Sequence, residues 1–182
     1  AEHVLAMLDE AIDEGKTHLV YSLVASWLAN PLGPEGSGWR RRAYRAASLY
    51  LRQLADAGDI EGAIAFLEEV QNAAEKLLIS EAAPDLLETA LPLAGESPAL
   101  ARTLFLLAAD HLPAAAFQRL VRTEDFARQL PPALQMALEH FRSGPPTPAP
   151  AGMLAQVAGE FGEARVLVVL ARLVEWAIAL ER

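Results

Sequence analysis

The sequence predicts an all-α fold of stacked antiparallel helical hairpins, and three observations lead to this fold class. Hydrophobic residues recur every three to four positions through much of the chain, as on the buried stripe of an amphipathic helix. The richness in alanine and leucine favours helix, because both residues have a high helix propensity. Glycines also stand where tight turns would join successive helices: Gly15, Gly58, Gly95 and Gly162. An irregular helical bundle is the alternative, because glycines between helices are common in any all-α fold.

The clearest element lies between Gly58 and Leu78. Gly58 can adopt the positive φ that a tight connection needs, and the Asp59 carboxylate can accept a free backbone N–H of the next helix. The apolar residues of that helix then fall on one stripe: Ile60, Ala63, Ile64, Leu67, Val70, Ala74, Leu77 and Leu78. This stretch is therefore predicted to be the turn and second helix of a hairpin.

Three further helices are predicted before this turn. The first covers residues 1–14, and Thr17 is expected to cap the second, which stops before Pro31. The loop 31–38 leads to the third helix, at about 39–57. The first two helices and their glycine turn repeat the layout of the hairpin that turns at Gly58.

Prolines and capping residues predict the later helices. Pro84 suits the first position of a helix that ends near Ala94, and Ser97-Pro98 is a cap followed by proline. The remaining helices are expected at 114–122, at 124–130, from Pro131 to about Arg142, up to about Phe161, and from Glu163 to Leu180.

The proline-rich stretch SGPPTPAP, residues 143–150, indicates an extended linker. We therefore predict a helical-repeat domain at 1–142 and a C-terminal helical hairpin at 151–182. That hairpin is expected to pack on the repeat stack or on a second chain.

The segment that begins at Gly58 resembles the tetratricopeptide (TPR) repeat. The family pattern has a Gly-Asp turn, a small residue five after the glycine, a bulky one nine after and a small one twelve after, here Gly58-Asp59, Ala63, Leu67 and Val70. The match covers about one repeat, and Val70 is larger than the usual alanine. The resemblance implies a right-handed superhelix and a non-catalytic interaction or scaffold module that binds a peptide or partner protein on its helical-repeat surface.

Composition limits the choice of partner and compartment. The net charge of −9 disfavours nucleic acid, because the phosphate backbone repels an acidic protein. No apolar run reaches the ~20 residues that a membrane span needs. The lack of cysteine and of a signal peptide indicates a cytoplasmic protein, and the excess of arginine over lysine indicates a GC-rich bacterial genome.

A cationic face is predicted on the third helix. Arg41, Arg45 and Arg52 share one helical face, since offsets of four and eleven residues nearly complete whole turns. With Trp39 and Tyr44 nearby, these arginines could bind the carboxylates of a protein or acidic peptide. The alternative is a solvated face whose arginines pair with acidic residues of this chain.

The closing helix is apolar on most sides. Val169, Leu173 and Trp176 are candidates for contact with a second copy of the chain, which would make a homo-oligomer. The alternative is a core helix that buries the same residues within one chain.

No motif predicts catalysis, a cofactor or a metal site. The four histidines are scattered without ligand spacing, and the carboxylates of Asp9, Glu10, Asp13 and Glu14 are expected on a solvated face. Two further function classes stay open: a regulatory domain of a bacterial transcription activator or signalling protein, and an all-helical enzyme with an unrecognised site.

Overall fold

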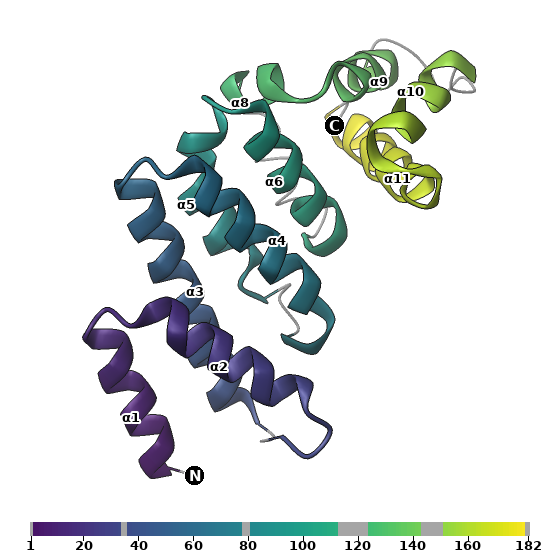
Figure 1. Ribbon diagram of the computed structural model, residues 1–182. Helices are drawn as coiled ribbons and strands as arrows, with labels where there is room; N and C mark the ends of the chain where they lie inside the picture. Colours follow the sequence, from purple (N-terminus) through teal and green to yellow (C-terminus); the bar gives the residue numbers. More distant parts are fainter. Residues whose placement is uncertain (1, 34–35, 78–80, 113–123, 143–150, 181–182) are drawn as a thin grey trace. The chain divides into compact units, whose positions relative to one another are not determined.

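A computed structural model describes residues 2–33, 36–77, 81–112, 124–142 and 151–180 (Figure 1). These residues form helices and no strand, which confirms the all-α prediction. Backbone contacts divide the chain into two compact units, residues 1–90 and residues 91–182. The predicted linker at 143–150 lies outside the described residues, so the expected boundary there stays a prediction.

The first unit is built from two helical hairpins and the start of a further helix. Its helices are α1 (Glu2–Asp13), α2 (Thr17–Ala29), α3 (Ser37–Asp56), α4 (Ile60–Leu77) and the first part of α5 (Ala83–Ala94). Helix α1 contacts α2 and α3, α2 also contacts α3 and α4, and α3 contacts α4. Each hairpin thus lies beside the next in chain order (Figure 1).

The two turns of this unit have the same construction. Gly15 and Gly58 adopt φ angles of 82° and 66°, which a residue with a side chain rarely does. The same two backbone hydrogen bonds close each turn: Gly15 N–H to the Ile12 carbonyl (3.0 Å) and Lys16 N–H to the Ala11 carbonyl (2.9 Å), then Gly58 N–H to the Ala55 carbonyl (3.0 Å) and Asp59 N–H to the Leu54 carbonyl (2.9 Å).

Of the two caps predicted in the first unit, one is confirmed and the other is wrong. Asp59 accepts the Gly62 N–H at 2.9 Å, as expected for a capping carboxylate. Thr17 is instead the first residue of α2 and is buried. Its hydroxyl donates to the side-chain oxygen of Gln53 on α3 at 3.1 Å, because packing between the hairpins turns Thr17 inward rather than along its own helix.

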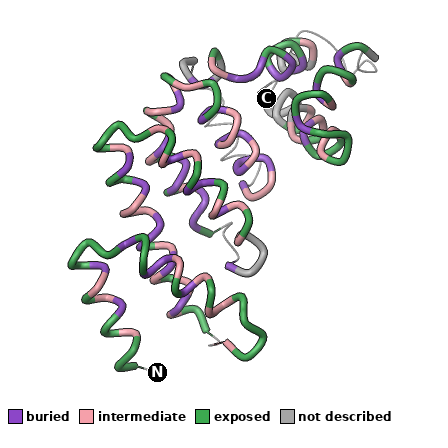
Figure 2. The backbone as a smooth tube through the Cα atoms, viewed as in Figure 1, coloured by how far each residue is buried: buried purple, intermediate pink, exposed green. Residues whose placement is uncertain are grey.

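Small residues allow the helices of the first unit to approach closely. Ala43, Ala46 and Ala47 on α3 and Ala63 on α4 are completely buried, and the buried sides of the helices face one another (Figure 2). Larger side chains fill the space beside them: Tyr21, Leu51, Phe66 and Leu67.

The second unit holds the later helices. They are the end of α5, α6 (Pro98–His111), α8 (Glu124–Gln129), α9 (Pro132–Arg142), α10 (Ala151–Phe161) and α11 (Glu163–Leu180). Ser97 caps α6 by accepting the Leu100 N–H at 3.2 Å, which confirms the predicted start at Ser97-Pro98. The predicted helix at 114–122 lies outside the described residues.

The closing hairpin packs on helices of its own chain. Gly162 makes the turn between α10 and α11 with a φ of 84°, and α11 contacts α6, α9 and α10. Arg172 reaches from α11 to donate to the Ala109 carbonyl on α6 at 2.7 Å, and Arg165 pairs with Asp110 at 3.0 Å. One side of α11 is therefore occupied within the second unit.

Candidate functional site

Two of the three arginines predicted to form a cationic face have no side-chain partner among the described residues. Arg41, Arg45 and Arg52 are all exposed on α3, as their spacing predicted. Arg45 pairs with Asp13 at 2.7 Å and with Asp9 at 3.7 Å. Within the described ranges, the side chains of Arg41 and Arg52 have no ion pair or hydrogen bond, so these two remain candidates for binding an acidic partner.

Arg42 joins α3 to α1. Its guanidinium donates to Asp9 at 2.6 Å, to the Leu5 carbonyl at 3.0 Å and to the Gly38 carbonyl at 3.1 Å. Together with the Arg45 pairs, these contacts show that part of the acidic face of α1 packs on the basic face of α3. The stated alternative, in which the arginines pair with acidic residues of this chain, therefore holds for Arg45. Sequence reasoning did not identify α1 as the source of the partners, although the opposite charges of the two helices were a usable signal.

The two aromatic residues predicted beside the arginines are built into the unit. Trp39 is buried and lies edge-on to Trp27, with ring centroids 5.5 Å apart. Tyr44 is half-buried, and its hydroxyl donates to the Leu77 carbonyl. Burial raises the pKa of Tyr44, and Glu81 adds to this rise. Both side chains hold helices together and present little surface to a partner.

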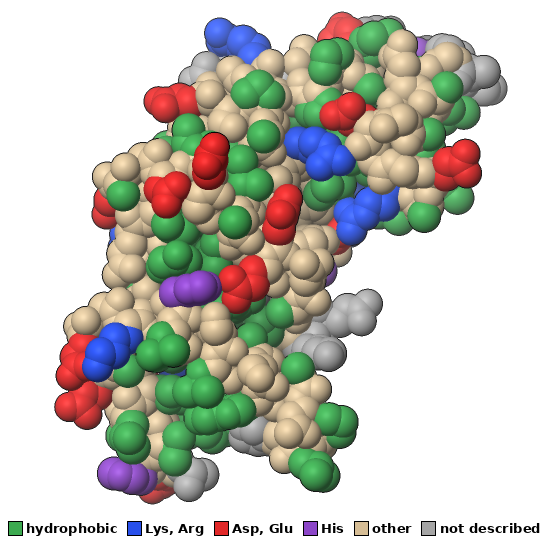
Figure 3. Space-filling view, viewed as in Figure 1, with side chains coloured by type: hydrophobic (Ala, Val, Ile, Leu, Met, Phe, Trp, Pro, Cys, Tyr) green, Lys and Arg blue, Asp and Glu red, His purple; other side chains and the backbone are tan. Residues whose placement is uncertain are grey.

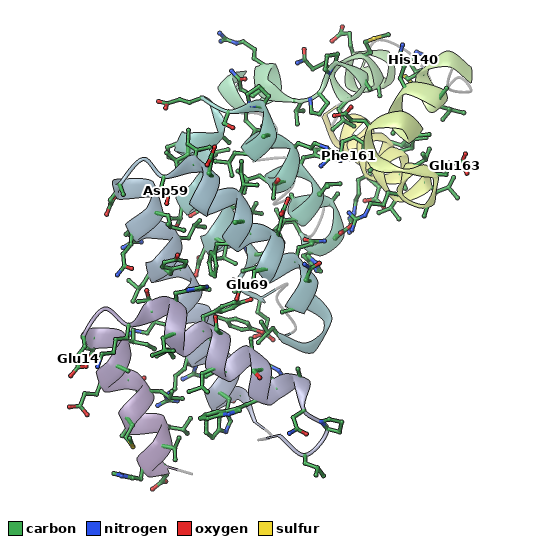
Figure 4. The ribbon with its side chains drawn as sticks, viewed as in Figure 1. Glu14, Asp59, Glu69, His140, Phe161 and Glu163 are labelled. Atoms are coloured by element: carbon green, nitrogen blue, oxygen red, sulfur yellow. The ribbon has the colours of Figure 1, made fainter. Side chains whose placement is uncertain are left out.

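A polar and aromatic cluster joins α2 to α3 and α4. The His18 Nε2 lies 3.1 Å from Glu69, and the Ser22 hydroxyl donates to the same carboxylate at 3.2 Å. The ring of His18 stacks on Tyr50 with centroids 4.5 Å apart and lies edge-on to Phe66 at 5.9 Å. Figure 4 labels Glu69 at this contact between helices.

This cluster does not have the order of a catalytic triad. A serine nucleophile needs a base within hydrogen-bond reach, with the third group behind the base. Here Glu69 stands between Ser22 and His18, and both residues bind it separately. Tyr21 is completely buried beside them, and burial together with Glu69 raises its pKa. The cluster therefore acts as a contact between helices.

The candidate oligomerisation residues on α11 lie partly inside the unit. Val169 is buried, and the side chains of Leu173 and Trp176 lie outside the described part of the chain. Among the side chains of α11 that the structure describes, the exposed large hydrophobic ones are Leu167 and Val168. Leu167 and Val168 are therefore accessible to another chain, whereas Val169 is not.

Four of the exposed large hydrophobic residues that the structure describes in the first unit lie on α1 and α2. Val4 and Met7 share a face of α1, and Leu19 and Leu23 share a face of α2. We call these four residues the α1–α2 outer face. Hydrophobic side chains gather over these two helices in Figure 3. The residues of α1 that reach α3, such as Asp9, lie on the opposite side of the helix.

Comparison with protein-family models, curated proteins and solved structures finds no match to this chain. Among the residues that the structure describes, no group of three histidine, aspartate or glutamate side chains is placed to hold a metal ion. No helix in the same residues combines the length and the hydropathy that a bilayer crossing requires. The site must therefore be judged from its own geometry.

Proposed function

We propose that this protein is a non-catalytic interaction module that binds a helical segment of a partner protein on the α1–α2 outer face. The proposal includes a TPR-like stack, in which successive hairpins cover one another and the first hairpin leaves one side open. The observation that carries it is the exposure of this face: Leu19 is 65% exposed and Met7 is 55% exposed. Contiguous apolar surface of this kind marks interaction sites.

The second hairpin supports the proposal, because two of the four positions equivalent to the outer face are buried there and the other two are half-buried. The matching turns at Gly15 and Gly58 align the two hairpins with an offset of 58 − 15 = 43 residues. Val4 then corresponds to Ala47, which is completely buried. Leu23 corresponds to Phe66, which is 3% exposed.

The cover on the second hairpin is helix α2. Met7 and Leu23 correspond to Tyr50 and Phe66, and the His18 ring of α2 contacts both. Helix α2 thus lies against this face of the second hairpin. The equivalent face of the first hairpin offers the same kind of surface to a helix from a partner.

The test is recovery of partner proteins from a lysate by the immobilised chain and its variants. Leu19→Glu/Leu23→Glu places charges on the outer face at exposed positions, so the fold is retained while apolar contact is lost. We expect partners captured by the wild type to be lost with this variant. Leu32→Glu is the matched control, because Leu32 is also exposed but lies in the loop after α2.

A partner that binds both glutamate variants and the wild type equally would overturn the proposal. A second pair of substitutions, Arg41→Glu/Arg52→Glu, tests the cationic face separately. Loss of capture with this pair alone would move the binding site to α3 and would favour an acidic partner.

A further inference from the structure

We infer that the partner helix received by the α1–α2 outer face carries an arginine or lysine followed directly by an aromatic residue. The inference rests on the proposed function and names the chemistry of the partner. Two observations carry it: the contacts that α2 makes with the second hairpin, and the different placement of charge at the equivalent positions of the first hairpin.

Helix α2 makes polar contacts with both helices of the second hairpin. Thr17 donates to the side chain of Gln53 on α3 at 3.1 Å. His18 and Ser22 both bond the Glu69 carboxylate on α4, at 3.1 Å and 3.2 Å. The second hairpin therefore receives α2 with a neutral amide on its first helix and a carboxylate on its second helix.

Between these polar contacts, α2 places two rings on the second hairpin. His18 stacks on Tyr50 and lies edge-on to Phe66. Tyr21 also lies edge-on to Phe66, with ring centroids 5.1 Å apart. The α2 residues that make these polar and ring contacts stand at i, i+1, i+4 and i+5, which places them on one side of the helix.

The first hairpin offers exposed apolar side chains where the second hairpin receives these rings. The offset of 43 residues between the two turn glycines relates Tyr50 to Met7 and Phe66 to Leu23. Met7 is 55% exposed and Leu23 is 37% exposed. An aromatic ring of a partner helix can therefore lie on them as the His18 ring lies on the second hairpin, and a methionine sulfur contacts such rings favourably.

The charge is placed differently at the two polar positions. Gln53 corresponds to Glu10, which is exposed and whose side chain has no ion pair or hydrogen bond among the described residues. Glu69 corresponds to Ser26, which is exposed and neutral. The carboxylate is thus on the first helix of this hairpin rather than on the second. A cation in the place that Thr17 takes on the second hairpin would pair with Glu10.

The chain itself does not carry this pair of residues. Within its 182 residues, no lysine or arginine is followed directly by an aromatic residue. A second copy of these residues therefore has no helix with the expected pair. The expected occupant is a helix of another protein, with the cation directly before the ring.

The experiment measures binding of labelled synthetic peptides to the full chain by fluorescence anisotropy. One alanine-rich helical peptide carries arginine, phenylalanine, tyrosine and serine at positions i, i+1, i+4 and i+5, and a second has glutamate in place of the arginine. We expect the wild type to bind the arginine peptide about fivefold more tightly, because an attractive exposed pair replaces a repulsive one. High salt should reduce this preference.

Charge reversal on the chain tests the position of the cation. Glu10→Arg should reverse the preference, so that the glutamate peptide binds more tightly. Glu61→Arg is the matched control, because it makes the same change of charge at an exposed position of the second hairpin and should keep the wild-type preference. The wild-type preference in Glu10→Arg would overturn the inference, and so would equal binding of the two peptides or no binding of either.

The outer-face variant separates this inference from the proposed function. If Leu19→Glu/Leu23→Glu binds both peptides as the wild type does, the peptides bind elsewhere and both proposals fail. If it loses both peptides while Glu10→Arg keeps the wild-type preference, the outer face is a docking surface but the expected cation is wrong. Helix content from circular dichroism confirms that each variant is folded.

Discussion

Tyr21 and His111 each bury a polar atom that has no hydrogen-bond partner among the described residues. A buried hydroxyl or ring nitrogen without a partner loses its bonds to water and gains none in return. A single substitution at either residue therefore measures how much the unpaired polar atom lowers the free energy of unfolding. Tyr44 provides the comparison, because its hydroxyl is bonded to the Leu77 carbonyl.

Tyr21→Phe is expected to raise the free energy of unfolding by about 1 kcal/mol, because it removes a buried hydroxyl without a partner. Tyr44→Phe is expected to lower it by about 1 kcal/mol, because the Leu77 carbonyl loses its donor. Urea denaturation of the two variants measures both values. A loss of stability in Tyr21→Phe would show that the hydroxyl has a partner in solution.

His111 should make stability depend on pH. Burial, with a smaller effect of Arg165, lowers its pKa from the usual 6.5, while Asp110 opposes this change. Between the lowered value and 6.5, the unfolded chain binds more protons than the folded chain, so stability falls as the pH falls through this window. His111→Gln removes the titrating group, so its free energy of unfolding should change less with pH in this window than that of the wild type. Denaturant unfolding of both proteins at each pH measures this difference. The same pH dependence in both proteins would contradict the prediction.

At the scale of elements, charge decides how α1 sits on α3. The side chain of Arg42 is 22% exposed and bonds one carboxylate and two carbonyls, whereas that of Arg45 is 48% exposed and, among the described residues, bonds carboxylates alone. Water screens an exposed pair, but a partly buried guanidinium with several acceptors is held more strongly. The two neighbouring arginines should therefore contribute unequally.

Arg42→Ala is expected to cost about 2 kcal/mol of stability, because three charge-assisted hydrogen bonds are lost. Arg45→Ala is expected to cost about 0.5 kcal/mol or less, as for other exposed ion pairs. Denaturant unfolding at low and high salt measures both, and only the small Arg45 effect should decrease with salt. Equal losses of stability in the two variants would contradict the expected difference between the two arginines.

At the scale of the whole molecule, the division into two compact units is the main feature. Each unit has its own buried residues, for example Leu51 in the first and Leu104 in the second. Helix α5 crosses the division, because its last turn belongs to the second unit. Local stability can differ between such units.

Leu51→Ala removes a fully buried side chain and should destabilise the first unit by about 3 kcal/mol. Amide hydrogen exchange is expected to show faster exchange in α1 to α4, with little change in α9 to α11. Leu104→Ala is the reciprocal variant, with the effect expected in the second unit. Loss of protection throughout the chain in either variant would show that the units unfold together.

The sequence by itself determined the helices and most of their ends. Apolar spacing, glycine turns and the caps at Asp59 and Ser97 act within one or two helical turns, so a short window of sequence contains the information. The expected start near Ser97-Pro98 and the turn at Gly58 are confirmed for this reason. Thr17 was misassigned because its hydroxyl partner, Gln53, is 36 residues away.

Only the tertiary structure decided which side of each helix is covered. Periodicity placed Trp39 near the arginines and Val169 on an apolar helix, but burial of both depends on residues far along the chain. The same holds for the exposed outer face, because Leu23 and Phe66 occupy equivalent positions in the two hairpins, and Phe66 is buried where the His18 ring of α2 packs against it. A helix sets the spacing of its side chains, and its neighbours decide which of them water can reach.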